Sequence, residues 1–155
     1  MSDFAVFMAG NAAVAENIKY VASKRFVDKK KPILDKDGNP TGKFTPIEWE
    51  LKPAGSDLDE AIRKECTKRV PIQGKRGQYN QETDTDKYVG KLCVACTVYP
   101  NLNDAELQDA FGVKSADALL KKMLKPGEYT EYKAKVMEVN GYDMSMDELV
   151  DEAKN

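Results

Sequence analysis

The stretch Ile47-Glu-Trp-Glu-Leu-Lys52 decides the fold, because its apolar residues alternate with charged ones. Alternation with a period of two predicts a β-strand that buries one face. Residues 18–26 show the same pattern, with Ile18, Tyr20 and Phe26 on one face. Two amphipathic strands close in sequence predict an antiparallel hairpin. A hairpin alone is marginal in water, so we expect its apolar face to lie on helices.

Between the two predicted strands lies a polar connection that is rich in turn residues. It contains the run Lys29–Lys31 and the segment Asp35–Pro40, both typical of a surface loop. The lysines are interpreted either as a solvated loop or as charges that blunt an exposed strand edge. Within this connection, Ile33 and Leu34 are candidates for an extra rung of the hairpin.

The N-terminal segment predicts a short helix that Ser2 caps and that ends at Gly10. Its apolar side carries Phe4, Phe7 and Met8. Two interpretations remain open, namely a terminal helix that packs on the core and an apolar hook that binds a partner protein.

After Pro53 the apolar period becomes helical. We expect a helix that Ser56 caps and that is stopped by Pro71, followed by a polar, glycine-rich loop to Thr83. Further helices are predicted at 84–99, 104–111 (capped by Asn103), 115–124 (capped by Ser115) and 128–139. A last, acidic helix follows, for which Ser145 and Glu148 form a capping box.

These elements predict an α+β fold, in which an N-terminal antiparallel β-hairpin packs on a C-terminal bundle of five or so short α-helices. The whole chain, 1–155, is expected to form one domain. Residues 1–53 supply the short helix and the hairpin, and residues 54–155 supply the helical part. With 155 residues, of which 41% are hydrophobic, the chain has enough apolar side chains for one core.

The sequence offers no recognisable catalytic apparatus. It contains no histidine, the commonest general base and metal ligand. Cys93 and Cys96 have the C-x-x-C spacing, but they fall within a predicted helix, and Cys66 alone cannot complete a tetrahedral metal site. We therefore interpret these cysteines as core packing and predict neither enzyme, metal nor cofactor. No apolar run is long enough to span a membrane.

A basic stretch runs from Arg63 to Arg76 and has a local net charge of +5. Its candidate contact residues are Arg63, Lys64, Lys68, Arg69, Lys75 and Arg76, with Tyr79 just beyond. Three interpretations remain open: a solvated face, a surface that binds an acidic protein helix, and a site for nucleic-acid phosphates. The predicted last helix carries a complementary acidic set, for which we predict self-association: Asp147, Glu148, Asp151 and Glu152. A homo-oligomer is therefore one possible partner arrangement.

Five segments taken in chain order closely resemble one family. They are Lys19–Phe26, Trp49–Pro53, Glu60–Arg69, Gly74–Tyr79 and Val94–Leu107. Together they resemble the XkdN-like tail assembly chaperones of long-tailed phages and prophages of Gram-positive bacteria. The resemblance runs from about Asn17 through Asn155. The sequence departs from the family pattern in one place. Family members often join the first two strands by a short turn, whereas about twenty residues lie between them here.

The resemblance implies a late, non-enzymatic phage protein that acts in the host bacterial cytoplasm and is absent from the mature virion. Its implied partners are the long, helical tape measure protein, which it keeps soluble, and the tail tube subunits, which it helps to recruit. Two alternatives come from other classes of protein. One is a structural tail-completion or connector protein of the virion. The other is a small nucleic-acid-binding module, which is less favoured because nucleic acid is not the expected partner.

Overall fold

The computed structural model describes residues 4–10 and 17–142. A small antiparallel sheet joins β1 (Ile18–Tyr20), β4 (Trp49–Leu51) and β7 (Thr97–Tyr99) in the order β1-β4-β7. In this sheet Lys19 pairs with Glu50, so the predicted hairpin between the two amphipathic segments is confirmed. The α+β fold class is confirmed as well.

The first strand is shorter than predicted. It ends at Tyr20 rather than at Phe26, because the chain leaves the sheet there and buries both Ala22 and Ser23. The third strand was missed. The predicted helix 84–99 stops at Cys96, and Thr97 takes an extended conformation while its hydroxyl donates a hydrogen bond to the Cys93 carbonyl.

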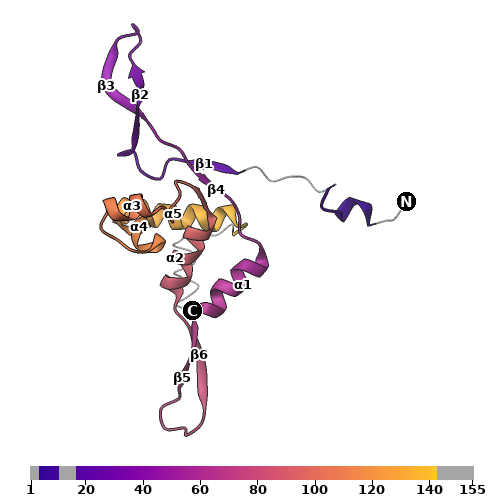
Figure 1. The fold of residues 1–155 in the computed structure, drawn as a ribbon. Coiled ribbons are helices and arrows are strands. Elements are labelled where there is room, and N and C mark those ends of the chain that lie inside the picture. The colour runs from indigo at the N-terminus through magenta and orange to yellow at the C-terminus, as the bar shows by residue number, and fades with distance from the viewer. Residues whose placement is uncertain (1–3, 11–16, 143–155) are drawn as a thin grey trace.

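The polar connection between β1 and β4 is a second hairpin. The interpretation of Lys29–Lys31 as a loop was therefore wrong, whereas the alternative, charges on an exposed strand edge, agrees with their exposed place in a two-stranded sheet. Strands β2 (Val27–Leu34) and β3 (Pro40–Pro46) pair in an antiparallel ribbon whose register shifts twice between Asp28 and Leu34. At the turn, the Asp35 carboxylate accepts hydrogen bonds from the backbone N–H groups of Asp37 and Asn39. This hairpin projects from one end of the molecule (Figure 1).

A third hairpin replaces the end of the first predicted helix. Helix α1 (Ser56–Glu65) stops well before Pro71, and its N-cap is Gly55 rather than Ser56. Strands β5 (Thr67–Pro71) and β6 (Tyr79–Thr83) then form a regular antiparallel ribbon where a loop was predicted. The ribbon projects from the opposite end to β2–β3 (Figure 1).

The remaining helices follow the predicted order. They are α2 (Thr85–Cys96), α3 (Ala105–Ala110), α4 (Ala116–Met123) and α5 (Pro126–Val139). Asp84 and Ser115 cap α2 and α4 through their side chains, whereas α3 is capped by Asp104 and not by Asn103. The predicted helix with the Ser145 capping box lies outside the described residues.

The core lies between the small sheet and the helices, with α2 in contact with α1, α4, α5 and β7. Trp49 packs edge-on against Tyr132 of α5, with ring centroids 5.4 Å apart. The apolar face of the predicted hairpin therefore lies on helices, as expected. Cys93 and Cys96 are fully buried free thiols in this core. No helix in the described part is long and apolar enough to cross a membrane.

Candidate interaction surface

The tip of the β5–β6 hairpin is shaped by two successive tight turns. The Lys75 N–H donates to the Ile72 carbonyl, and the Gln78 N–H donates to the Lys75 carbonyl. The third residues of these turns, Gly74 and Gly77, have φ of 82° and 78°. Glycine reaches such positive φ values at little cost, so the sequence Gly74–Gly77 dictates a tip that presents its charged residues outward.

Strand register divides the basic residues of the hairpin between its two faces. Arg69 pairs with Gln81, and Lys68 pairs with Glu82. Because successive side chains of a strand point to opposite faces, Arg69 and Lys68 cannot act on the same surface. The Arg69 guanidinium lies over the Tyr79 ring, 4.6 Å from its centroid, so these two residues share one face. We call it the Arg69 face.

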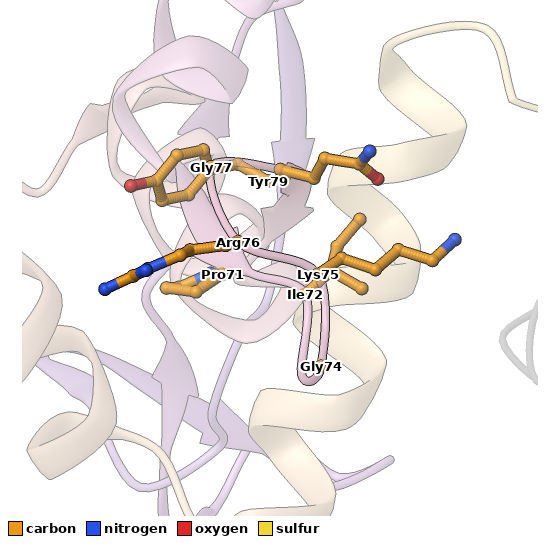
Figure 2. Close-up of a pocket in the computed structure, with 8 residues that line it drawn as sticks. Pro71, Ile72, Gly74, Lys75, Arg76, Gly77 and Tyr79 are labelled. Carbon is orange, nitrogen blue, oxygen red and sulfur yellow. The ribbon is translucent and has the colours of Figure 1, made fainter.

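The tip adds a further cation to the Arg69 face. In Figure 2 the side chains of Arg76 and Tyr79 point to the same side of the loop, while Lys75 points to the opposite side. The loop encloses an open hollow of about 430 Å³ that Pro71, Arg76 and Tyr79 help to line.

A groove lies between the outer face of α1 and the base of the hairpin. Its volume is about 660 Å³. We call it the α1–hairpin groove, and its lining residues are Glu60, Arg63, Lys64, Thr67, Gln81 and Thr83. Thr67 and Gln81 belong to the Arg69 face by strand alternation, so the groove and that face form a continuous surface. Two cations, Arg63 and Lys64, stand on its helical wall.

The two cations differ in how firmly neighbouring residues hold their side chains. The Arg63 guanidinium stacks on the Tyr88 ring at 4.4 Å, donates to the Tyr88 hydroxyl at 3.0 Å and lies 3.5 Å from an Asp59 carboxylate oxygen. Tyr88 in turn donates to Asp59. Arg63 thus joins α1 to α2 and holds the groove wall in place. Among the residues that the structure describes, Lys64 pairs with Glu60 alone, and such an exposed ion pair contributes little to stability.

The Tyr88 cluster is a structural feature, as its electrostatics indicate. The pKa of Tyr88 is raised, first by burial and then by the hydrogen bond to the Asp59 carboxylate, although Arg63 opposes the shift. A phenol kept protonated in this way serves as a fixed donor between two elements.

The structure thus brings together part of the predicted contact set. Arg63, Lys64, Arg69, Arg76 and Tyr79 border one surface, whereas Lys68 and Lys75 point away from it. At the N-terminus the structure has one turn of 3-10 helix, Ala5–Phe7, where a longer helix was predicted.

The predicted apolar hook carries strongly exposed side chains, with Phe4 69%, Phe7 77% and Met8 55% accessible. The predicted acidic residues Asp147, Glu148, Asp151 and Glu152 lie outside the described residues. Within residues 4–10 and 17–142 there is no cluster of cysteine and carboxylate side chains that could hold a metal ion.

Sequence reasoning missed the neutral residues of the groove. Thr67 and Thr83 face each other across the hairpin and share a hydrogen bond of 2.7 Å between their hydroxyls. The flanking residues show no apolar alternation, so the only signal in the sequence was the pair of glycines, Gly74 and Gly77, which are typical of tight turns.

Comparisons with known proteins agree with this fold. Residues 4–154 match the family described as phage XkdN-like tail assembly chaperone protein. The chain is 31% identical to the phage-like element PBSX protein XkdN of Bacillus subtilis (strain 168), over 99% of this chain and 94% of that protein. It is 30% identical to the protein YqbN of the same strain, over 99% of this chain and 93% of that protein.

A crystal structure of the protein YqbN superposes with a TM-score of 0.68 at 28% identity, covering 92% of this chain and 99% of that one. The structural match covers 92% of this chain, and the family match extends over residues 4–154. The chain belongs to the XkdN-like family of phage tail assembly chaperones.

Proposed function

We propose that this chain binds the tape measure protein of its phage, keeps it soluble and helps to bring tail tube subunits to it. The observation that carries the proposal is the continuous cationic surface of the α1–hairpin groove and the Arg69 face, in a chain that belongs to a tail assembly chaperone family. In this proposal, residues 1–155 act as a single domain that binds other proteins, and the function requires neither catalysis nor a cofactor.

The surface suits a helix that carries both apolar and acidic residues. The aliphatic parts of Arg and Lys cover apolar surface while their charged ends pair with carboxylates at the rim. Tyr79 adds an aromatic contact, half exposed beneath Arg69. A helix lying in a groove is a common mode of peptide recognition, and covering its apolar stripe removes the tendency to aggregate.

The exposed N-terminal side chains support a second point of contact. Phe7 and Met8 lie more than half accessible to solvent, which is unusual for large apolar residues unless a partner covers them. Two contacts on one chain raise the affinity for a long partner, because the second binding event is intramolecular.

The proposal places the protein in the host bacterial cytoplasm during assembly and outside the finished particle. Mass spectrometry of purified particles tests this, and a stoichiometric presence there would favour a structural tail-completion role instead. Salt-dependent retardation of DNA or RNA by the purified chain would favour a nucleic-acid-binding role.

The function itself is tested by co-expression. The tape measure protein is produced with and without this chain, and the soluble fraction is measured after sedimentation. We expect the tape measure protein to be largely insoluble alone and largely soluble with the chain. Equal solubility in the two cultures would reject the chaperone function.

A further inference from the structure

The end of α5 determines where the C-terminal segment leaves the body. Gly141 has φ of 89°, its N–H donates to the Glu138 carbonyl, and the Tyr142 N–H donates to the Met137 carbonyl. This pair of hydrogen bonds is the Schellman motif, which turns the chain sharply at a helix end. These hydrogen bonds fix the backbone as far as Tyr142.

The exit point lies beside α1. The side-chain oxygen of Asn140 accepts a hydrogen bond of 2.8 Å from the Ala54 N–H, just before α1 begins. Burial lowers the pKa of Arg63, but Tyr88, Asp59 and Tyr142 together raise it above its ordinary value, so Tyr142 lies within electrostatic range of Arg63. Arg63 lines the α1–hairpin groove. The chain therefore leaves the body close to the wall of the groove.

The sequence beyond the exit complements the groove in charge. Residues 143–155 contain five carboxylates and a single lysine, a net charge of −4. Four of the carboxylates recur at the spacing that aligns them along one side of a helix, namely Asp147, Glu148, Asp151 and Glu152. The groove and the Arg69 face carry Lys64, Arg69 and Arg76. Within residues 4–10 and 17–142, the one acidic partner of these cations on the same face is Glu60, which pairs with Lys64.

The segment 143–155 is long enough to contact the groove of its own chain. Thirteen residues span about 20 Å when helical and roughly twice that when extended. Strand β5 has five residues and is about 17 Å long. The segment can therefore extend from Tyr142 along the groove to the Arg69 face without help from a second chain.

We propose that the acidic segment 143–155 docks in the α1–hairpin groove of its own chain and occupies the surface that an acidic partner would use. An intramolecular ligand acts at a high effective concentration, so even weak ion pairs keep the groove covered. A partner helix must displace the segment, which restricts binding to partners with more apolar contact than the tail offers. This consequence rests on the proposed function, whereas the docking does not.

The docking is tested on the purified full-length chain with a carbodiimide, which joins a lysine amine to a carboxylate in direct contact. Lys64 on the groove wall is expected to form cross-links to the carboxylates of 147–152, identified by peptide mass spectrometry. Lys68, on the other face of the hairpin, serves as the internal control and is expected to form none with that segment. The yield should fall severalfold at about 1 M salt, where the Debye length is about 3 Å.

Isotope labelling separates docking within a chain from docking between chains. Labelled and unlabelled chains are mixed before cross-linking, and we expect each linked pair of peptides to share one isotope. Mixed pairs would overturn the intramolecular proposal in favour of self-association. Cross-links spread evenly over Lys64, Lys68 and Lys29–Lys31, or absent from Lys64, would overturn the assignment of the groove.

Two matched variants test the role of charge. Arg69→Glu should lower the Lys64 cross-link yield severalfold, while Lys68→Glu should leave it unchanged. Equal yields in the two variants would contradict the proposal. Since the measurement needs no partner, a chain that cross-links as expected but fails to solubilise the tape measure protein would disprove the proposed function and leave the docking intact.

Discussion

The guanidinium of Arg69 lies 4.6 Å from the centroid of the Tyr79 ring, so the two side chains form a stacked pair on one face of the β5–β6 hairpin. Lys68, the preceding residue, is opposite Glu82 on the other face. Two adjacent cations thus belong to different surfaces. Arg69 lies on the face that continues into the α1–hairpin groove, and Lys68 lies opposite a cross-strand carboxylate.

The first prediction compares charge reversals at these neighbours. Arg69→Glu should weaken binding of the tape measure protein by about tenfold or more, because it replaces an attractive charge in the contact by a repulsive one. Lys68→Glu should change affinity by less than about threefold, because a charge outside the contact affects binding only through long-range electrostatic interactions, which salt screens. Affinity is measured by titration of the purified variants, and equal losses would show that the Arg69 face is not the contact.

The second prediction concerns the core. Trp49 is 1% exposed and packs on Tyr132, so Trp49→Ala should lower the free energy of unfolding by about 3–5 kcal/mol. Tyr99→Ala is the control, because Tyr99 is 53% exposed at the sheet edge and should change the free energy by about 0.5 kcal/mol or less. Urea denaturation measures both, and a Trp49 effect as small as the control would contradict the packing described.

The third prediction is a pH dependence from Cys93. Burial, with a smaller contribution from Cys96, raises the pKa of the Cys93 thiol from 9.0 to about 12. In the unfolded chain the thiol loses its proton near pH 9, whereas the folded protein keeps it protonated. Cys93 therefore contributes stability below pH 9 that is lost as the pH rises towards 12, at up to about 1.4 kcal/mol per pH unit.

Cys93→Ser isolates this contribution because a hydroxyl does not titrate in the range. The variant should be less stable at pH 7, since a polar hydroxyl replaces a buried thiol. Its free energy of unfolding should nevertheless fall less steeply between pH 9 and 12. Parallel curves for the variant and the natural chain would show that Cys93 does not titrate as described.

The fourth prediction tests the glycine turns. Gly77→Ala should destabilise the hairpin by about 1–2 kcal/mol, because a side chain at φ of 78° clashes with its own backbone. Gly127→Ala is the matched control, since Gly127 lies in the first turn of α5 with open space around it and no positive φ. That control should stabilise the chain by up to about 1 kcal/mol. Thermal unfolding distinguishes them, and the same sign for both would contradict the turn geometry.

Local patterns predicted the elements whose boundaries are set locally. The alternation around Trp49 indicated β4, and Ser115 indicated the start of α4, because a strand face and a helix cap each depend on a few neighbouring residues. The antiparallel pairing of β1 with β4 followed from two amphipathic strands near each other in sequence, whereas its register, with Lys19 opposite Glu50, was not predicted. Here local preference and tertiary packing agree.

The hairpins were missed where the pattern was ambiguous. Cys66 continues the apolar spacing of α1, so the helix was extended through residues that pair as β5, and only the contact between Thr67 and Thr83 reveals the ribbon. In β2 the run Lys29–Lys31 gives no alternation, because that hairpin is held by backbone hydrogen bonds rather than by a buried face. The short strand β7 continues the apolar stripe of α2 and was absorbed into the helix.

The candidate surface was predicted in composition but not in geometry. The basic stretch from Arg63 to Arg76 was evident from the sequence, yet its division between two faces depends on strand register. The role of Arg63 in holding α1 to α2 depends on Tyr88 and Asp59, which only the folded structure brings together.

The central claim is that this chain binds the tape measure protein and keeps it in solution. Size-exclusion chromatography with light scattering, applied to the two proteins after co-expression, tests that claim most directly. We predict one soluble peak whose mass corresponds to a tape measure chain with one or more copies of this protein. A tape measure protein found only in aggregates, with this chain eluting alone, would contradict it.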